Sequence, residues 1–457
     1  MVASAQGRTV VRNAPPSSNG NAATEELTPP ISPARSPGPM SLDACIDLGF
    51  QHQPALDAAR ASLAASHSGK RGVDRLIIPR LLDRSLPVRR EQACHGVTIA
   101  EAGLTQAEWE TRYAVTRNFF TVQYIRSQQV VVQDVLRSLD TGYARAKKIF
   151  DVGDPANKIT QIDLDAIKVQ IAILNGKKSQ ADNGMLKALA ALREAMGLAY
   201  DYPLEIAAVD LPRAVNLVTE EYLEKVLDDK GKDTGKTVKK QRLRYDPVYK
   251  FDKAALIAAA VANRGEIIQA NAARCVTELE IEAQSIGRGW RMDTFARASD
   301  IHVQPVPQGL MNGEYRPGAF APEYPTMLAG RKRDREQRAR DLDQRMAAVV
   351  DKANNLVSLD VEVQYLKWQE ALEDIQALRG IYETAQNLPD RVLKLVQGKD
   401  LTSTAIIQAN LTAIMVRTQL NEEMHTHALA LAGLERATAG AFRVYPIPAA
   451  PPTMPLK

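Results

Sequence analysis

The chain has 457 residues, of which 58 are Lys or Arg and 54 are Asp or Glu, so its formal net charge is only +4. A surplus this small over such a length argues against a nucleic-acid-binding protein. Apolar residues make up 45% of the chain, but aromatic residues only 5%. A core built from Ala, Leu, Val and Ile is typical of long helices packed at close range. The composition therefore predicts a mostly helical protein.

Residues that commonly carry chemistry are sparse and scattered. Cys45, Cys94 and Cys275 lack the paired spacings of a disulfide framework or a zinc site. His425 and His427 are two residues apart, so on a helix they point to different faces and cannot share a metal ion. No Ser-His-Asp grouping, phosphate-binding glycine loop or paired-carboxylate site stands out. We expect no catalytic residue, no metal, no cofactor and no enzyme activity.

The two ends of the chain differ from the rest in composition. Residues 1–40 are polar and contain seven prolines, so they cannot form a core and are expected to be disordered. They also lack the apolar stretch of about 7 to 15 residues that a secretory signal needs. The tail, residues 443–457, is again rich in proline. No window of about 18 consecutive apolar residues predicts a transmembrane helix.

Helical periodicity starts after Ser41, and proline at 54 favours the start of a second helix. The strongest pattern covers residues 115–150, where apolar residues fill nine of eleven positions spaced alternately by three and four. Gly153 and Pro155 then stop the helix, and residues 167–195 resume the same spacing. Two long helices joined by a short turn must lie antiparallel, which predicts a long helical hairpin.

The chain then repeats itself. Residues 46–59 correspond to 257–270 at an offset of 211, and residues 192–195 correspond to 434–437 at an offset of 242. The change in offset predicts about 31 extra residues in the second half, which we place in the stretch between Ser285 and Gly330 that is rich in Gly and Pro. A second hairpin turns at 397–399, and Pro389 is expected to kink the helix before it.

Two further features of the sequence have a structural and a functional interpretation. Lys230–Arg244 holds seven basic residues against one acidic residue, Asp233. We interpret it as a solvated loop, with contact to an anionic surface as the alternative. His427 lies on the apolar seam of the last helix and is interpreted as a core histidine with satisfied hydrogen bonds. Glu423 shares that seam, which leaves open a pair between the two.

Three segments together carry a resemblance to a known family. They are Leu42–Leu48 followed by His52-Gln53-Pro54 (with Ala254–Glu266 in the second half), Phe150–Gly153 followed by Ile159–Leu164, and Ala430–Gly440. In their order, spacing and duplication they resemble the repeat start, hairpin tip and repeat end of the TolC-like outer-membrane efflux proteins. The resemblance covers about residues 41–442.

The resemblance implies a function and partners. Proteins of this family form trimers whose helices build a conduit across the periplasm, and their hairpin tips meet the adaptor protein of an inner-membrane pump. By resemblance, Gly153 and Asp163 mark the first tip and Gly398 the second, and the chain would be a homotrimer in the outer membrane and periplasm. A plain helical turn explains the same three residues without any partner.

The fold class that we expect is mostly α, with two tandem repeats of long antiparallel coiled-coil hairpins, a small irregular or β insertion and little or no recognisable β-barrel. Candidate strands at 300–307 and 314–321 alternate only briefly before prolines interrupt them. The alternative function is therefore a helical scaffold or interaction protein derived from the family that does not span the outer membrane, with a cytoplasmic location. We divide the chain into a disordered leader (1–40), a first repeat (41–198, tip near 151–160), a charged linker (199–250), a second repeat (251–442, insertion 285–330, tip near 397–405) and a proline-rich tail (443–457).

Overall fold

A computed structural model describes residues 38–77, 84–152, 159–227, 233–286, 291–295, 299–301, 320–322, 326–397 and 403–442. All of them belong to one compact unit, Ser36–Lys457. The leader expected at 1–40 lies, apart from its last three residues, outside the described residues, as does the tail at 443–457.

The first repeat consists of four helices: α1 (Leu42–His52), α2 (Pro54–Asp74), α3 (Leu86–Val152) and α4 (Gln161–Ala195). The Ser41 hydroxyl accepts a hydrogen bond from the backbone N–H of Ala44 (3.2 Å) and so caps the start of α1. Proline at the first position of α2 lacks only an N–H that has no helical partner there. The predicted seam is buried at Val115, Val122 and Leu139. Between the last two, the buried residues are Val131 and Val135 in place of the predicted neighbours at 132 and 136, so the seam positions are confirmed only in part.

The second repeat has the same four parts: α5 (Lys253–Asn263), α6 (Gly265–Ile286), α8 (Lys332–Gln397) and α9 (Ser403–Ala437). Helix α5 begins and ends 211 residues after α1, and helix α9 begins and ends 242 residues after α4. These are the two offsets that the sequence predicts. Pro389 lies inside α8, whose helix continues to Gln397.

Short strands form the insertion between α6 and α8. Strand β3 (Arg291–Phe295) pairs with β6 (Thr326–Gly330), and β4 (Ser299–Ile301) pairs with β5 (Phe320–Pro322), both antiparallel. One pair is thus nested inside the other. The β insertion expected at 285–330 is confirmed, since in the first repeat only a short connection joins α2 to α3. The candidate strands at 300–307 and 314–321 lie mostly outside the described residues.

The segment that joins the repeats corrects one expectation. Strand β1 (Val215–Leu227) and strand β2 (Asp233–Pro247) form a long antiparallel hairpin, in which Val215 pairs with Pro247 and Lys225 with Thr237. The interpretation of Lys230–Arg244 as a solvated loop was therefore wrong from Asp233 onward. Basic residues spread over a strand leave the backbone free to pair, so charge alone does not decide between loop and strand.

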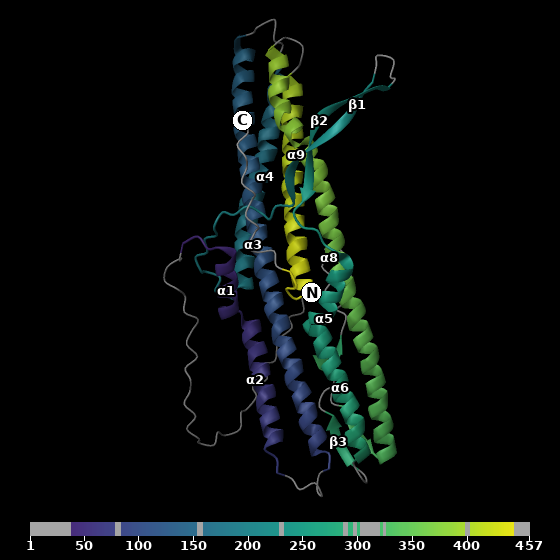
Figure 1. Cartoon of the computed structure of the whole chain (residues 1–457). Coiled ribbons are helices and arrows are strands. Elements are labelled where there is room, and N and C mark those ends of the chain that lie inside the picture. Colours follow the sequence, from purple (N-terminus) through teal and green to yellow (C-terminus); the bar gives the residue numbers. More distant parts are fainter. Residues whose placement is uncertain are drawn as a thin grey trace, which may run out of the picture. The chain divides into compact units, whose positions relative to one another are not determined.

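The long helices lie side by side (Figure 1), and the contacts between them give their order. Helix α4 packs on α3, α3 on α9, and α9 on α8, so α4 and α8 are the outer members of this layer. Beyond the ends of α4 and α9, the shorter helices take over: α2 and α6 pack on the first half of α3, and α5 and α6 pack on α8.

Two apolar cores hold the repeats together. One joins α5, α6, α8 and α9, and contains Val357, Ile375 and Leu434. The other lies around the middle of α3 and includes Phe119 and Phe120, and two small residues of α9 join it. Because α9 contributes to both cores, the two repeats fold as one body. In the part of the chain that is described, no helix is both long and apolar enough to cross a membrane.

Candidate functional site

The first hairpin tip is held at its α4 side by a reciprocal cap. The Asp163 carboxylate accepts hydrogen bonds from the Thr160 backbone N–H (2.9 Å) and hydroxyl (2.8 Å). The Thr160 hydroxyl in turn accepts from the Asp163 N–H (3.3 Å), which completes a capping box. Thr160 and Asp163 therefore cap the start of α4 together. Of the three residues that the sequence places at the tips, Gly153 and Gly398 lie outside the described residues.

Two large apolar side chains are exposed next to this cap. Val152 is 80% exposed and Ile162 79% exposed, one on each side of the turn. Below them a small core of Ala146, Leu164 and Ile167 joins α3 to α4. Large apolar side chains that stay exposed next to a packed core are typical of a contact surface.

Polar contacts between α3 and α9 connect the two hairpins. Arg417 and Asp134 form an ion pair (3.0 Å). Further along, the His425 ring stacks on Tyr124 with ring centroids 4.5 Å apart and shares a hydrogen bond of 3.2 Å with the Thr121 hydroxyl. These contacts fix the register between the two repeats.

A cluster of buried charges lies where α3, α6, α8 and α9 meet; we call it the central charge cluster, and it consists of Glu110, Arg264, Glu266, Asp360 and Arg436. The completely buried Asp360 carboxylate accepts from Arg436 (2.9 and 3.0 Å) and from Arg264 (2.9 Å). Arg264 also donates to Glu266 (2.6 and 3.0 Å), and Arg436 donates to Glu110 (2.8 Å). Burial disfavours the charge of Arg436, but Asp360 and Glu110 outweigh it and raise the pKa of its guanidinium.

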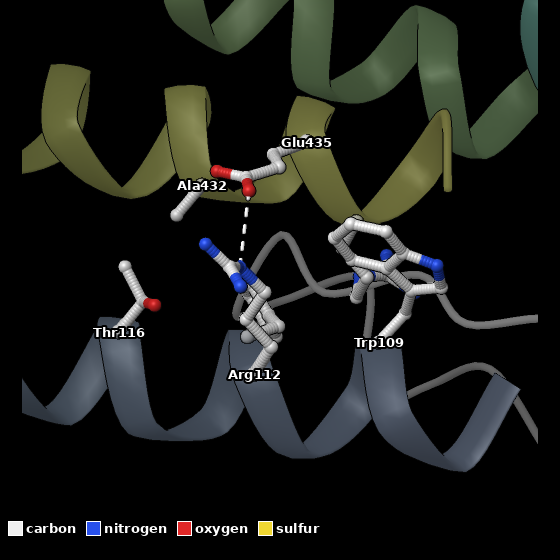
Figure 2. A pocket seen from close by; sticks show the side chains of 7 residues that line it. Trp109, Arg112, Thr116, Ala432 and Glu435 are labelled. Atoms are coloured by element: carbon white, nitrogen blue, oxygen red, sulfur yellow. Dashed lines mark hydrogen bonds and ion pairs between the residues drawn. The ribbon is translucent and has the colours of Figure 1, made fainter. Parts of the chain in front are cut away.

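The described part of the chain has a small cavity beside this cluster, between α3 and α9 (Figure 2). Trp109, Arg112 and Thr116 of α3 face Ala432 and Glu435 of α9, and Arg112 donates to Glu435 (3.2 Å) across it. The cavity is small, about 10 Å³, which is about enough for one water molecule. It has no room for a substrate.

The pair that the sequence left open between Glu423 and His427 does not form. Glu423 accepts a hydrogen bond from Gln419 (3.2 Å), and its pKa is raised by burial and by neighbouring carboxylates. His427 is completely buried, but neither ring nitrogen has a hydrogen-bond partner among the described residues, and burial lowers its pKa to about 4. The expectation of a core histidine is right, whereas that of satisfied hydrogen bonds was wrong.

Sequence reasoning missed the central charge cluster, although one signal was present. The repeat ends read Leu192-Arg193-Glu194-Ala195 and Leu434-Glu435-Arg436-Ala437, so the two charged residues exchange places between otherwise matching ends. Such an exchange on a buried helix end indicates a change of ionic partners. Among the described residues, no group of three or more His, Cys, Asp or Glu could hold a metal ion.

Comparison with known proteins supports the architecture but not a close relationship. No family model and no curated protein matches the chain. Among solved structures, the outer membrane protein VceC of Vibrio cholerae has a TM-score of 0.62 and 13% identity, over 88% of this chain and 97% of VceC. The outer-membrane channel OprN has a TM-score of 0.63 and 11% identity (87% and 90%), and the open MtrE outer membrane channel of Neisseria gonorrhoeae has 0.55 and 14% (87% and 89%). The chain therefore has the TolC-like fold, in a divergent form.

Proposed function

We propose that this chain is a TolC-like efflux component: a passive conduit formed by three copies, located in the outer membrane and periplasm, and coupled through an adaptor to an inner-membrane pump. The observation that carries the proposal is the match of the whole helical layer, both hairpins and both short-helix pairs, to outer-membrane channels over 87–88% of this chain. The match also covers 89–97% of each of these solved structures. It is therefore not limited to one common helical hairpin.

The layer also suits a conduit on physical grounds. The α3–α4 and α8–α9 hairpins lie next to each other with ion pairs and stacked rings between α3 and α9. Such a layer can curve into a wall when copies continue it edge to edge. In the proposal, the work of transport is done by the pump, and the chain needs no catalytic residue.

We place the adaptor contact at the hairpin tips, near Gly153, Asp163 and Gly398. The exposed Val152 and Ile162 supply an apolar surface beside the charged Asp163, which is the combination of apolar centre and polar rim common in protein contacts. Capping of α4 by Asp163 is compatible with this role, because a cap fixes the position of the neighbouring exposed side chains.

The first test is location and export in the native cell. We expect the tagged full chain to fractionate with the outer membrane and to resist salt and alkaline washing. Loss of the gene should raise the accumulation of a fluorescent dye that the cell's pumps export, and the full chain should restore export. Recovery of the chain in the cytoplasm, with unchanged dye accumulation, would contradict the conduit and leave the helical scaffold.

A second test separates the tip contact from the cap. Asp163→Asn removes the charge but keeps an oxygen that can accept from Thr160, so the thermal melting temperature should stay near that of the wild type. Export should fall if the carboxylate contacts the adaptor. Asp165→Asn, in the next charged position of α4, is the matched control because Asp165 bonds to Gln161 and Lys168 of its own helix. Equal export in both variants would remove Asp163 from the contact.

A further inference from the structure

We propose that the end of the molecule opposite the hairpin tips binds a membrane surface that carries anionic phospholipid headgroups. The inference goes beyond the proposed conduit and depends neither on the trimer nor on the adaptor. We call this end the arginine end. It consists of the last turn of α2 and the residues after it (71–77), the start of α3 with the two residues before it (84–91), the end of α6 (279–286) and the start of α8 with the residue before it (331–338).

The four segments of the arginine end are held together by their own side chains. Arg90 of α3 donates to the backbone carbonyl of Asp74, the last residue of α2 (3.1 Å). Arg89 of α3 forms an ion pair with Glu280 of α6, and Arg335 of α8 donates to a glutamine side chain at the end of α6 (2.8 Å). Figure 1 shows these helix ends together, at the end of the layer away from the start of α4. The charges that they carry therefore form one surface.

Basic residues outnumber acidic ones at the arginine end. It holds 10 Lys or Arg against 6 Asp or Glu, a surplus equal to that of the whole chain of 457 residues. Its exposed acidic residues are Asp74, Glu91 and Asp334. Its exposed basic residues are Arg71, Arg75, Arg84, Arg90, Arg331, Lys332, Arg333 and Arg338. A positive surface of this kind attracts anionic groups.

Helix stability does not explain where these charges lie. The N-terminus of a helix carries a partial positive charge, which favours acidic side chains and disfavours basic ones. Yet α3 has no acidic residue in its first turn and begins between Arg84 and Arg89, and α8 begins with Lys332 and Arg333 before its first acidic residue. At the first hairpin tip the usual rule holds, since Asp163 helps to cap the start of α4. The arginine end thus combines two helix N-termini with basic side chains, an arrangement that suits phosphate.

The kind of basic residue also indicates phosphate. Nine of the ten basic residues at the arginine end are Arg. The planar guanidinium offers paired donors that match a phosphate group, whereas the ammonium of Lys acts as a point charge. In the helix ends at the first tip (145–152 and 161–168), three of the four basic residues are Lys. The two ends of the molecule therefore differ in chemistry as well as in the placement of charge.

Two exposed apolar side chains favour a membrane over a soluble phosphate compound. Leu76 and Ile77 lie two and three residues after the end of α2 and are 44% and 97% exposed. They follow Arg75 directly, and Arg90 donates to the Leu76 carbonyl (3.0 Å). Apolar side chains among basic ones are typical of proteins that bind at a membrane surface, where the apolar groups enter the acyl boundary and the charges meet the headgroups. A soluble phosphate compound has no use for them.

The test is flotation of the purified full chain with vesicles of phosphatidylcholine, and with vesicles in which one third of the lipid is phosphatidylglycerol. Each basic residue near an anionic surface contributes about fivefold to binding. We therefore expect at least about tenfold stronger binding to the anionic vesicles at about 0.1 M salt, and loss of most of this preference at about 0.5 M salt.

One variant combines Arg75→Gln, Arg84→Gln and Arg333→Gln, which removes one charge from each of three helix ends. None of these three side chains has a hydrogen bond or ion pair with another described residue. The thermal melting temperature should therefore stay near that of the wild type, while binding to the anionic vesicles falls at least about tenfold. Ile77→Ser, which removes the most exposed apolar side chain, should also weaken this binding about tenfold.

The matched control combines Arg145→Gln, Lys147→Gln and Lys148→Gln at the first hairpin tip. These residues are exposed, and the control removes the same net charge from the other end of the molecule. We expect its binding to anionic vesicles to equal that of the wild type. Millimolar glycerol phosphate should not displace the wild-type chain from the vesicles; displacement would assign the site to a soluble phosphate compound and overturn the membrane contact.

The outcomes separate this inference from the proposed function. Equal flotation with both kinds of vesicle, or an equal loss of binding in the two triple variants, would overturn the inference. If such a chain still fractionates with the outer membrane and restores dye export, the conduit remains. A chain that prefers anionic vesicles but is recovered in the cytoplasm and does not affect dye export would keep this contact and overturn the conduit.

Discussion

The two repeats build the same junction between short and long helices with different chemistry. In the first repeat, the Gln53 side chain donates to the carbonyls of Ala195 (3.0 Å) and Glu194 (3.2 Å). In the second repeat, Arg264 occupies the equivalent position and donates to the carbonyl of Ala437, which is equivalent to that of Ala195. The first repeat makes this junction with a neutral amide, whereas the second repeat makes it with a charged guanidinium.

The difference shows which of the two junctions depends on ionic partners. The charge of Arg264 is buried, so it requires Glu266 and Asp360, and through Asp360 it is linked to Arg436 and α3. Breaking one partner of such a network leaves an uncompensated buried charge, whereas the amide junction loses only hydrogen bonds. The second repeat is therefore the more sensitive one, and its cluster also connects it to the first.

The largest expected effect comes from Asp360→Asn. This change keeps the shape but leaves Arg264 and Arg436 without their shared carboxylate, which should lower the free energy of unfolding by about 3 to 5 kcal/mol. Gln53→Ala, at the equivalent junction, should cost about 1 kcal/mol. Urea unfolding of the purified full chain, followed by far-UV circular dichroism, measures both. Equal losses would show that the two junctions do not differ in the way proposed.

The repeat architecture was predictable, and the chemistry of the junction was not. Offsets of 211 and 242 place α5 and α9 to the residue, because a duplicated helix pattern preserves apolar spacing. The cluster depends instead on which side chains from four helices converge, and spacing along one helix does not encode that. The β1–β2 hairpin was missed for a related reason: the pairing of β1 with β2 is a contact between segments, whereas a run of Lys and Arg is a local property.

Histidine provides the next largest contrast between the repeats. His427 is fully buried, its ring nitrogens lack hydrogen-bond partners among the described residues, and its pKa falls to about 4, below the ordinary 6.5. The unfolded chain then binds a proton between pH 6.5 and 4 that the folded chain does not, so stability is lost as the pH falls through this range, by about 3 kcal/mol for this group. The equivalent residue of the first repeat is Met185.

His427→Met makes the second repeat like the first at this position. In the wild type, His427 makes the free energy of unfolding smaller at pH 4.5 than at pH 7. We expect the His427 share of this difference to disappear in the variant. His425, whose pKa is also lowered to about 4 by burial and by Arg117, should retain its own share. Urea unfolding at the two pH values gives the comparison, with His52→Gln, an exposed histidine, as the control. An unchanged pH dependence in His427→Met would contradict the assignment.

A smaller effect is expected at the end of α4. Gly197 has φ of +69°, and its N–H donates to the Glu194 carbonyl while the next N–H donates to Arg193, which ends the helix in a Schellman turn. A Cβ at Gly197 would collide with the His52 carbonyl oxygen. Gly197→Ala combines an unfavourable backbone conformation with this close approach and should cost about 2 kcal/mol or more. Thermal unfolding measures it, and exposed Gly176→Ala in α4 should be neutral or stabilising.

The smallest effect tests whether the second repeat tolerates a poorer version of the same turn. At the end of α9 the equivalent hydrogen bonds run from Ala439 to Arg436 and from Gly440 to Glu435, but Ala439 holds a φ of +49° where the first repeat has glycine. Relief of about 1 to 2 kcal/mol of backbone strain in Ala439→Gly is partly offset by the greater freedom of glycine in the unfolded chain. A net stabilisation of about 0.5 kcal/mol should result. The control is Ala430→Gly, inside α9, which should lower the free energy of unfolding by about 1 kcal/mol. If Ala439→Gly also lowers the free energy of unfolding, the backbone at Ala439 is not strained.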